Sequence, residues 1–566
     1  MSEQTSLFQT TCLHSLVKVF PDETLSEPSL QRGTALWSET FSFQVAYRSE
    51  NSIHPLYISV SSELGSQVSI RSVGLSPSEL PTYSYSDDYV LRKTPGLYPD
   101  KLLPIPKEGI RAYPGQWRSV WVTINLPSLA EWNQTNSKMD PSFEINISFE
   151  NQAGDQLGSE RFVLDVLSTE LPKQKLIHSE WLHCDCIASY YKVDILGEKH
   201  WELIERYVEG AVQHGVNMLL TPLFTPPLDT AIGGERPTVQ LVEVECTMEE
   251  EYRFNFDKLS RWLEMCNRVG IQYFEFSHLF TQWGAKHAPK IIATVHKNGE
   301  AKKEQIFGWD TDAKGDSYRH FLSQFLPALA SYLEERGLTE RCYFHVSDEP
   351  ALDQLEDYRS ARSILREYLE DFPFIEALSD YSFYEQGLVP VPIPSNDHIE
   401  EFLEHDVKPL WTYYCCGQSV EVSNRFFNMP SSRNRILGYQ LYKFEIQGFL
   451  HWGYNFWNTQ YSLEAIDPYQ VTDAGGAFAS GDAFVVYPGH EGPIDSIRWE
   501  VFNEALQDLR ACELLESLIG RSQVLELLEK GLDSPLTFRN FPRDASWLLS
   551  KREEINRQIA VHLSDK

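Results

Sequence analysis

Apolar and polar residues alternate in short runs along the first third of the chain. These runs read LHSLVKVF, FSFQVAYRS, LYISVSSE, SVWVTINLP, FEINISFEN and RFVLDVLS, and turn residues separate them. Evenly spaced alternating strands without long helices are typical of an antiparallel sandwich. We therefore predict an N-terminal antiparallel β-sandwich domain over residues 1–172, with a long loop at 76–106.

From His178 onward, short apolar runs alternate with stretches of helical periodicity. The predicted strands are 178–185, 217–224, 273–280, 342–349, 376–380, 389–394, 408–415 and 448–457. Repeated strand–helix alternation is typical of an α/β fold, and eight such units predict a (β/α)8 TIM barrel. We assign the barrel to residues 173–520 and a C-terminal helical extension to 521–566. The connection between the fifth and sixth strands is too short for a full helix.

The fourth predicted strand ends in two adjacent carboxylates, in the run CYFHVSDEP. Neighbouring side chains in a strand point to opposite faces, so Asp348 and Glu349 can line one pocket only where the strand stops. Pro350 stops the strand and favours an extended conformation at Glu349. An alternative interpretation is that Ser347 or Asp348 simply caps a following helix.

The active site of a barrel lies at the carboxyl ends of its strands. Further polar and aromatic candidates for substrate contact fall at these ends: His183, Asp185, His278, Asp380, Tyr414, Trp452, Tyr454 and Trp457. Tyr413 and Tyr414 point in opposite directions, so at most one of them enters the pocket. The loop around Trp283 follows the third strand and could cover the site. Core packing stays open as the alternative for the histidine at 183 and for the two tryptophans.

The charge balance narrows the classes of partner. With 81 acidic and 49 basic residues the formal charge is -32, which argues against nucleic acid or an anionic membrane and favours a neutral substrate. The chain begins without a signal-peptide pattern and contains no apolar run of membrane-spanning length, so we predict a cytoplasmic protein. The sequence does not determine the oligomeric state.

The nine cysteines lack the spacing of a disulfide scaffold, which is consistent with reduced thiols. Cys184 with Cys186 and the pair Cys415–Cys416 do not form C-x-x-C motifs. Structural zinc sites usually need two such pairs, so we predict neither a metal site nor a cofactor.

A carboxylate pair among tryptophans and tyrosines is typical of a glycosidase. Adjacent carboxylates are poorly placed for double displacement, in which two carboxyl groups ~5 Å apart flank the scissile bond. They suit the variant in which the acetamido group of the sugar attacks the anomeric carbon. Asp348 would then orient the acetamido group and stabilise the cationic intermediate. Glu349 would act as acid and then as base, with a pKa raised by burial and by its neighbour.

Six motifs together resemble glycoside hydrolase family 123 over roughly residues 175–520: FHVSDEP, EWLHCDCIASYY, GVNMLLTPLFTPPLDT, SHLFTQWGA, GFLHWGYNFW and SIRWEVFNEALQDLR. The resemblance implies a retaining exo-β-N-acetylgalactosaminidase or hexosaminidase with substrate-assisted catalysis, Asp348 and Glu349 as catalytic pair, and a small oligosaccharide or glycoside as substrate. It leaves the choice between galacto and gluco configuration open.

Two other functions remain as alternatives. One is a carbohydrate-binding barrel protein without catalysis. The other is a metal-assisted hydrolase with His183, Asp185 and His278 as ligands.

Overall fold

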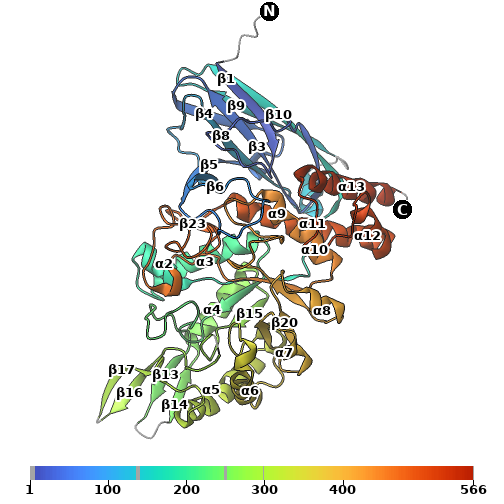
Figure 1. Ribbon diagram of the computed structural model, residues 1–566. Helices are drawn as coiled ribbons and strands as arrows, with labels where there is room; N and C mark the ends of the chain where they lie inside the picture. Colours follow the sequence, from blue (N-terminus) through green and yellow to red (C-terminus); the bar gives the residue numbers. More distant parts are fainter. Residues whose placement is uncertain (1–6, 136–140, 248–250, 283, 298, 565–566) are drawn as a thin grey trace, which may run out of the picture. The chain divides into compact units, whose positions relative to one another are not determined.

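The computed structural model describes residues 7–564 except 136–140, 248–250, 283 and 298 (Figure 1). Contacts within the chain group it into two compact units. The β-rich unit runs to Gln174 and also includes Ser419–Lys443 and the chain from Ile494 onward. The pocket unit comprises Lys175–Gln418 and Phe444–Pro493. The division into domains at 172 and 520 stays a prediction.

Two five-stranded sheets form the β-rich unit. The first sheet has the order β1 (Phe8–His14), β3 (Thr40–Ser49), β8 (Trp117–Asn125), β5 (Val68–Ser78), β6 (Gly96–Pro104). The second has the order β2 (Arg32–Trp37), β10 (Gln156–Glu170), β9 (Ser142–Glu150), β4 (Ile53–Ser61), β7 (Ile110–Ala112). Neighbouring strands are antiparallel, except β2 and β10, which are parallel. The predicted β-rich N-terminal region is confirmed, but the loop predicted at 76–106 is wrong, because β6 lies within it and pairs with β5.

Period-two patterning explains the core of this unit. In β9 the side chains of Phe143, Ile145, Ile147 and Phe149 are buried, whereas the residues between them are exposed or half-buried. One apolar face of each sheet thus packs into a shared core. The same unit contains the helices α1 (Leu129–Thr135), α9 (Ser431–Arg435), α10 (Leu437–Lys443), α11 (Ile497–Ile519), α12 (Arg521–Glu529) and α13 (Ala545–Ser564).

The pocket unit is built on a parallel sheet. Its six strands have the order β18 (Cys342–Tyr343), β15 (Tyr273–Phe276), β12 (Met218–Thr221), β11 (Ile177–Glu180), β22 (Gly448–His451), β21 (Trp411–Tyr413). A separate parallel pair consists of β19 (Ile375–Ala377) and β20 (Val391–Ile393). Two isolated β-bridges join the pair to the edges of the six-stranded sheet. Phe344, directly after β18, bridges to Phe374, directly before β19, and Ser395, after β20, bridges to Tyr413 of β21. Each predicted strand position therefore holds a strand, whereas a closed eight-stranded barrel stays a prediction.

Helices follow most strands of this unit. They are α2 (Cys184–Tyr191), α3 (Glu198–Gln213), α4 (Asp257–Val269), α5 (Asp316–Glu334), α6 (Leu355–Arg366), α7 (Ser382–Glu385) and α8 (Glu400–Glu404), with short 3-10 turns η2 (Thr339–Arg341), η3 (Leu352–Gln354) and η4 (Gln460–Ser462). In α3 the buried residues Trp201, Ile204, Val208 and Ala211 recur at helical spacing and form one apolar face. Among the described residues we find no helix that is both long and apolar enough to cross a membrane.

A second sheet in the pocket unit was not predicted. It has the order β14 (Tyr252–Asn255), β13 (Glu243–Cys246), β16 (Ile291–Lys297), β17 (Glu300–Phe307) and is drawn near α5 in Figure 1. Phe254 of β14 packs against Phe321 and Phe325 of α5, which attaches the sheet to the unit. Two short strands, β23 (Val486–Pro488) and β24 (Pro493–Asp495), come later in the chain.

Candidate active site

A pocket of about 200 Å³ lies at the carboxyl ends of the parallel strands. Its lining comes from the last residues of β19, β21 and β22 and from segments that follow β11, β12, β15, β18, β21 and β22. These residues are Trp181, His183, Leu228, Asp229, Gln282, Asp348, Glu349, Ala377, Tyr413, Cys415, Cys416, Leu450, Trp452, Gln460, Tyr461 and Phe478. Of the residues predicted from the sequence, Asp348, Glu349, His183 and Trp452 are among them.

The backbone turns sharply between the two carboxylates. Strand β18 ends at Tyr343, and Glu349 has a φ of 46°, in the left-handed region that residues with a side chain rarely adopt. The Glu349 N–H donates a hydrogen bond to the carbonyl of Ala377 (3.1 Å), which holds this conformation. The extended conformation predicted for Glu349 is therefore wrong. The turn is what lets both Asp348 and Glu349 line one pocket.

Neither Ser347 nor Asp348 caps a helix. The Ser347 hydroxyl donates to the carbonyl of Thr281 (3.0 Å), and Asp348 Oδ2 accepts a hydrogen bond from Gln282 Nε2 (3.1 Å). The following turn η3 has Ala351 at its N-cap. The capping alternative is thus wrong, and both side chains are directed to the segment after β15.

The two carboxyl groups differ in their surroundings. Asp348 is buried, whereas Glu349 is exposed to the pocket. Burial raises the pKa of Asp348 well above its ordinary value, and the neighbouring Glu349 carboxylate adds to this shift. The Tyr413 hydroxyl donates to Glu349 Oε1 (2.7 Å), and burial, together with the Glu349 charge, raises the pKa of Tyr413 so that it remains a donor. We predicted a buried Glu349, but Asp348 is the buried residue of the pair.

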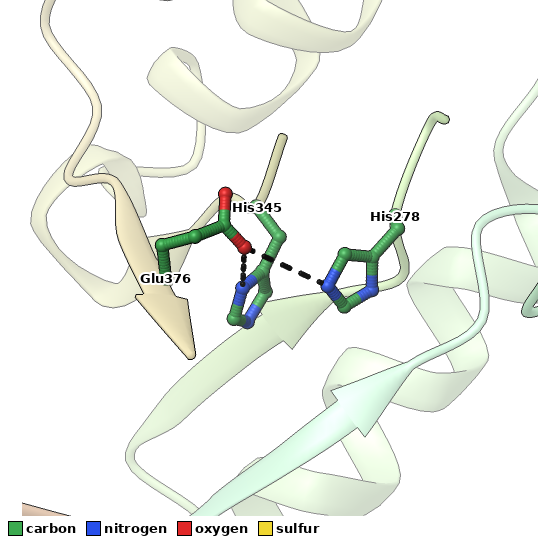
Figure 2. Close-up of side chains that lie close together, drawn as sticks. All are labelled: His278, His345 and Glu376. Atoms are coloured by element: carbon green, nitrogen blue, oxygen red, sulfur yellow. Dashed lines mark hydrogen bonds and ion pairs between the residues drawn. The ribbon is translucent and has the colours of Figure 1, made fainter. Parts of the chain in front are cut away.

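In the same segment as this pair, the ring of His345 lies between the carboxylates of Glu275 in β15 and Glu376 in β19. Its Nε2 donates to Glu275 Oε1 (2.8 Å) and its Nδ1 donates to Glu376 Oε1 (3.2 Å); Figure 2 shows the second contact. Burial alone would lower the pKa of His345, but these two hydrogen bonds raise it to about 10. His345 is therefore an imidazolium at neutral pH, and its charge opposes the upward shift of the Asp348 pKa.

His278 stacks on His345 with ring centroids 4.3 Å apart, and its Nε2 lies 4.0 Å from Glu376 Oε1 (Figure 2). Ligand atoms of His278, His345 and Glu376 all lie within 4.8 Å of one another, a set that could hold a divalent metal ion. However, both ring nitrogens of His345 already donate to carboxylates, and Glu376 Oε2 accepts the Tyr358 hydroxyl (2.9 Å). We interpret the cluster as an ion-paired support for the Asp348 segment.

His183 and Asp185 belong to a different cluster. Arg236 donates to both oxygens of Asp185 (2.9 and 2.8 Å), and its Nη2 lies 3.2 Å from His183 Nδ1. Burial alone would raise the pKa of Asp185, but Arg236 holds it below the ordinary value. Burial and Arg236 lower the pKa of His183 to about 4, so this ring is neutral. The metal-ligand set of His183, Asp185 and His278 is thus split between two clusters.

The other predicted substrate contacts lie outside the pocket lining. Tyr454 and Trp457 are buried and donate hydrogen bonds to backbone carbonyls. Tyr414 is buried against aromatic rings, while its neighbour Tyr413 reaches the pocket. Asp380 accepts the backbone N–H of Ser382 (3.0 Å), at the start of α7.

Sequence reasoning missed Glu275, Glu376 and Gln282, and it did not single out Trp181. Trp181 Nε1–H donates to Glu275 Oε1 (2.7 Å), beside the bond from His345. A signal was available for the two glutamates, since each is a lone carboxylate inside an apolar strand run, YFEF and FIEAL. A charge in a buried strand needs a partner, and that requirement marks a functional or structural network. The predicted cover at Trp283 lies outside the described residues.

Comparisons with known proteins agree with this arrangement. The family model "Glycoside hydrolase 123, catalytic domain" matches residues 181–515, more than half of the chain. Among solved structures, a family 123 glycoside hydrolase from Clostridium perfringens, studied for glycolipid glycan hydrolysis, has a TM-score of 0.73 at 16% identity over 98% of both chains. At that identity the likeness shows a shared fold.

A family 5 mannosidase from Rhizomucor miehei reaches a TM-score of only 0.36 at 10% identity, over 61% of this chain and 95% of that one. This value is too low to support an argument. No curated protein matches the chain.

Proposed function

The chain belongs to glycoside hydrolase family 123 and hydrolyses glycosidic bonds, and we propose that it is a retaining exo-β-N-acetylgalactosaminidase or hexosaminidase that uses the 2-acetamido group of its substrate. The observation that carries this proposal is the pair Asp348–Glu349, two consecutive carboxyl groups in one pocket. The pocket volume of about 200 Å³ is below the ~300 Å³ at which sites for drug-sized ligands begin, which supports binding of one terminal sugar.

In the first step the acetamido oxygen attacks the anomeric carbon while Glu349 donates a proton to the departing glycosidic oxygen. Asp348 accepts the acetamido N–H and stabilises the positive charge of the cyclic oxazolinium intermediate. Glu349 suits the acid role because it faces the pocket, where a bound sugar would exclude water from it. Trp452 and Trp181 offer aromatic surface to the sugar ring.

In the second step Glu349, now ionised, removes a proton from water, and the resulting hydroxide opens the oxazolinium ring at the anomeric carbon with net retention. The Tyr413 hydroxyl stabilises this ionised Glu349 through its 2.7 Å hydrogen bond. The two carboxyl groups need one proton between them in the first step. In the free enzyme burial and the neighbouring Glu349 raise the pKa of Asp348, which favours a proton on the pair. An acetamido N–H that donates to Asp348 favours its ionised form and leaves the proton on Glu349.

The alternatives are weaker on the same observations. A metal-assisted hydrolase would need a ligand set, and the predicted one is split between the Arg236 and His345 clusters. A carbohydrate-binding protein without catalysis has no need for a buried Asp348 beside an accessible Glu349. Elemental analysis and turnover assays separate these three functions.

The test is a panel of chromogenic β-glycosides with wild type and Glu349→Gln. We expect cleavage of 2-acetamido substrates, with the galacto and gluco isomers compared directly, and negligible cleavage of 2-hydroxy analogues. Glu349→Gln should lower the rate by about 10²–10⁴-fold for poor leaving groups and much less for activated phenols. Equal cleavage of the 2-hydroxy and 2-acetamido glycosides would rule out substrate assistance. Glycolipid glycans, on which the Clostridium perfringens relative was studied, are the first natural substrates to try.

A further inference from the structure

Two neighbouring cysteines form part of the pocket wall. Cys415 and Cys416 both line the pocket, and their Sγ atoms lie 4.0 Å apart. All nine cysteines fall within the described part of the chain, and these two are half-buried whereas the others are buried. A small reagent in the pocket therefore meets two thiols side by side, and the reactivity of a thiol depends on such access.

Hydrogen bonds hold the first of these thiols in place. The backbone N–H of Cys415 and its thiol both donate to Gln418 Oε1 (2.9 and 3.4 Å). Gln418 Nε2 in turn donates to Asp397 Oδ1 (3.0 Å). The contact with Cys416, together with burial, raises the pKa of Cys415 well above its ordinary value, so this thiol is protonated at neutral pH. The first attack on an oxidant therefore falls to Cys416, and Cys415 lies where it can resolve the product.

The dithiol is close along the chain to a contact with Glu349. Tyr413, two residues before Cys415, is the last residue of β21 and donates to Glu349 Oε1 (2.7 Å). A disulfide between adjacent residues strains the chain, because their Cα atoms are about 3.8 Å apart and disulfides usually need at least ~4.4 Å. Its formation also removes the thiol hydrogen that Cys415 donates to Gln418. The segment that carries Tyr413 therefore has to shift when the disulfide forms.

We propose that Cys415 and Cys416 are a site of reversible oxidation, at which a peroxide converts the two thiols into a disulfide that slows hydrolysis. The effect on hydrolysis rests on the proposed function, whereas the oxidation itself does not. Because strained disulfides are reduced more easily than structural ones, a thiol reductant restores both cysteines.

The oxidation takes place in two steps. Cys416 Sγ attacks one oxygen of hydrogen peroxide and the O–O bond breaks. The second oxygen leaves as water with the thiol proton, and Cys416 becomes a sulfenic acid. Cys415 Sγ then attacks Cys416 Sγ, so that the S–S bond forms and the S–O bond breaks. The sulfenic hydroxyl leaves as water with the proton of the Cys415 thiol. Two thiols and one peroxide thus give one disulfide and two waters.

The experiment follows turnover and the state of the cysteines in the same sample. Wild type is treated with hydrogen peroxide, assayed with a chromogenic 2-acetamido β-glycoside and mapped by mass spectrometry of its peptides. We expect a disulfide within the peptide that contains Cys415 and Cys416. We also expect kcat to fall by roughly 10-fold, the effect of losing one hydrogen bond to a charged group. Dithiothreitol should restore the rate.

Three variants show whether the pair is responsible. Cys415→Ala and Cys416→Ala cannot form the disulfide, so neither should show the 10-fold reversible loss, each measured against its own untreated rate. The matched control is Cys246→Ser, because Cys246 is the least buried of the remaining cysteines, at 7% exposed, and is not among the lining residues. This variant should respond to peroxide and to reductant as wild type does.

The inference is overturned if the two thiols stay reduced, if the disulfide forms without a change in rate, or if the alanine variants lose activity as wild type does. If untreated wild type cleaves no 2-acetamido glycoside, the proposed function fails. In that case the peptide map still decides the oxidation site, which a disulfide at Cys415 and Cys416 supports and reduced thiols refute.

Discussion

The β-rich unit and the pocket unit both bury carboxylates, but they neutralise them differently. In the β-rich unit Arg435 pairs with Asp508 and Glu504 (both 2.7 Å), and Arg552 pairs with Asp508 (3.0 Å) and Glu39 (2.7 Å). All five side chains are buried. Two guanidinium groups thus serve three carboxylates, and burial raises the pKa of Glu504 to about 7, which reduces the excess negative charge.

In the pocket unit Glu275, Glu376 and Asp348 are buried around one imidazolium, that of His345. Glu275 and Glu376 bind His345 directly, whereas Asp348 accepts its hydrogen bond from the neutral amide of Gln282. Arginine pairing thus neutralises most of the buried charge in the first cluster. A carboxylate that accepts only from a neutral amide retains the capacity to stabilise a positive charge that develops later. The following predictions test that difference.

Removing one carboxylate from the paired cluster should have the largest effect. Asp508→Asn leaves Arg435 and Arg552 with less compensation, so we expect the free energy of unfolding to fall by roughly 3–5 kcal/mol. Denaturant unfolding measures this loss, and kcat of the folded fraction should not change. The matched control is Asp165→Asn, which breaks the exposed pair with Arg32 and should alter stability by less than about 1 kcal/mol. Equal losses for both variants would contradict the comparison.

The reverse is expected for Asp348. Asp348→Asn removes the charge that stabilises the intermediate, so kcat should fall by about 10²–10³-fold whatever the leaving group. Stability should stay the same or rise, because burial disfavours the ionised Asp348. Rates and melting temperatures measure both effects, with the exposed Asp353→Asn as control. A thiazoline mimic of the intermediate should inhibit wild type strongly and Asp348→Asn weakly. Strong inhibition of both would show that Asp348 does not bear this role.

His345 should give the pocket unit a distinct pH dependence. Its pKa rises from 6.5 to about 10 on folding, so the folded state holds the extra proton. The resulting stabilisation is complete below pH 6.5 and is lost as the pH rises through 10. Within that window the unfolding free energy should decline by up to about 1.4 kcal/mol per pH unit from this group alone. His345→Gln should lack that part of the slope in a denaturation series, and an unchanged slope would refute the imidazolium assignment.

The smallest effect is expected at Tyr413. Tyr413→Phe removes the hydrogen bond to Glu349 Oε1, which is worth about 1.5 kcal/mol for a charged acceptor. We therefore expect kcat to fall by roughly 10-fold, mainly when the second step, with ionised Glu349, limits the rate. Substrates with activated leaving groups isolate that step. Tyr414→Phe is the matched control, because Tyr414 is not among the lining residues, and a drop of the same size there would contradict the assignment.

Several features were predictable because local chemistry decides them. Alternation of apolar residues located the strands of the N-terminal sheets, and strand–helix alternation located the positions of the parallel strands. The adjacent carboxylates and the proline that follows them predicted that Asp348 and Glu349 line one pocket, whereas the strand ends at Tyr343, earlier than the predicted end at 349. These features depend on residues close together in the sequence, and such spacing is visible without a structure.

The sequence could not decide which face of each strand turns inward. Tyr413 and Tyr414 were known to point in opposite directions, yet the register of β21 against β22 sets Tyr413 toward Glu349. Likewise Pro350 predicted an extended Glu349, but the carbonyl of Ala377 on another strand captured its N–H and imposed the left-handed conformation. In both cases a contact with a distant segment outweighed the local preference.

By itself the sequence determined the family, the strand positions and the pair of carboxylates that lines the pocket, because these follow from short motifs and from periodicity. Only the tertiary structure decided the charge environment, since Glu275, His345 and Glu376 come from three segments that meet in space. In the tertiary structure Asp348, rather than Glu349, is the buried residue of the pair. Asp229 and Tyr461, which are 232 residues apart in the sequence, form a hydrogen bond. The physical reason is that pKa shifts and pocket walls depend on which distant groups burial brings together, and composition and spacing do not contain that information.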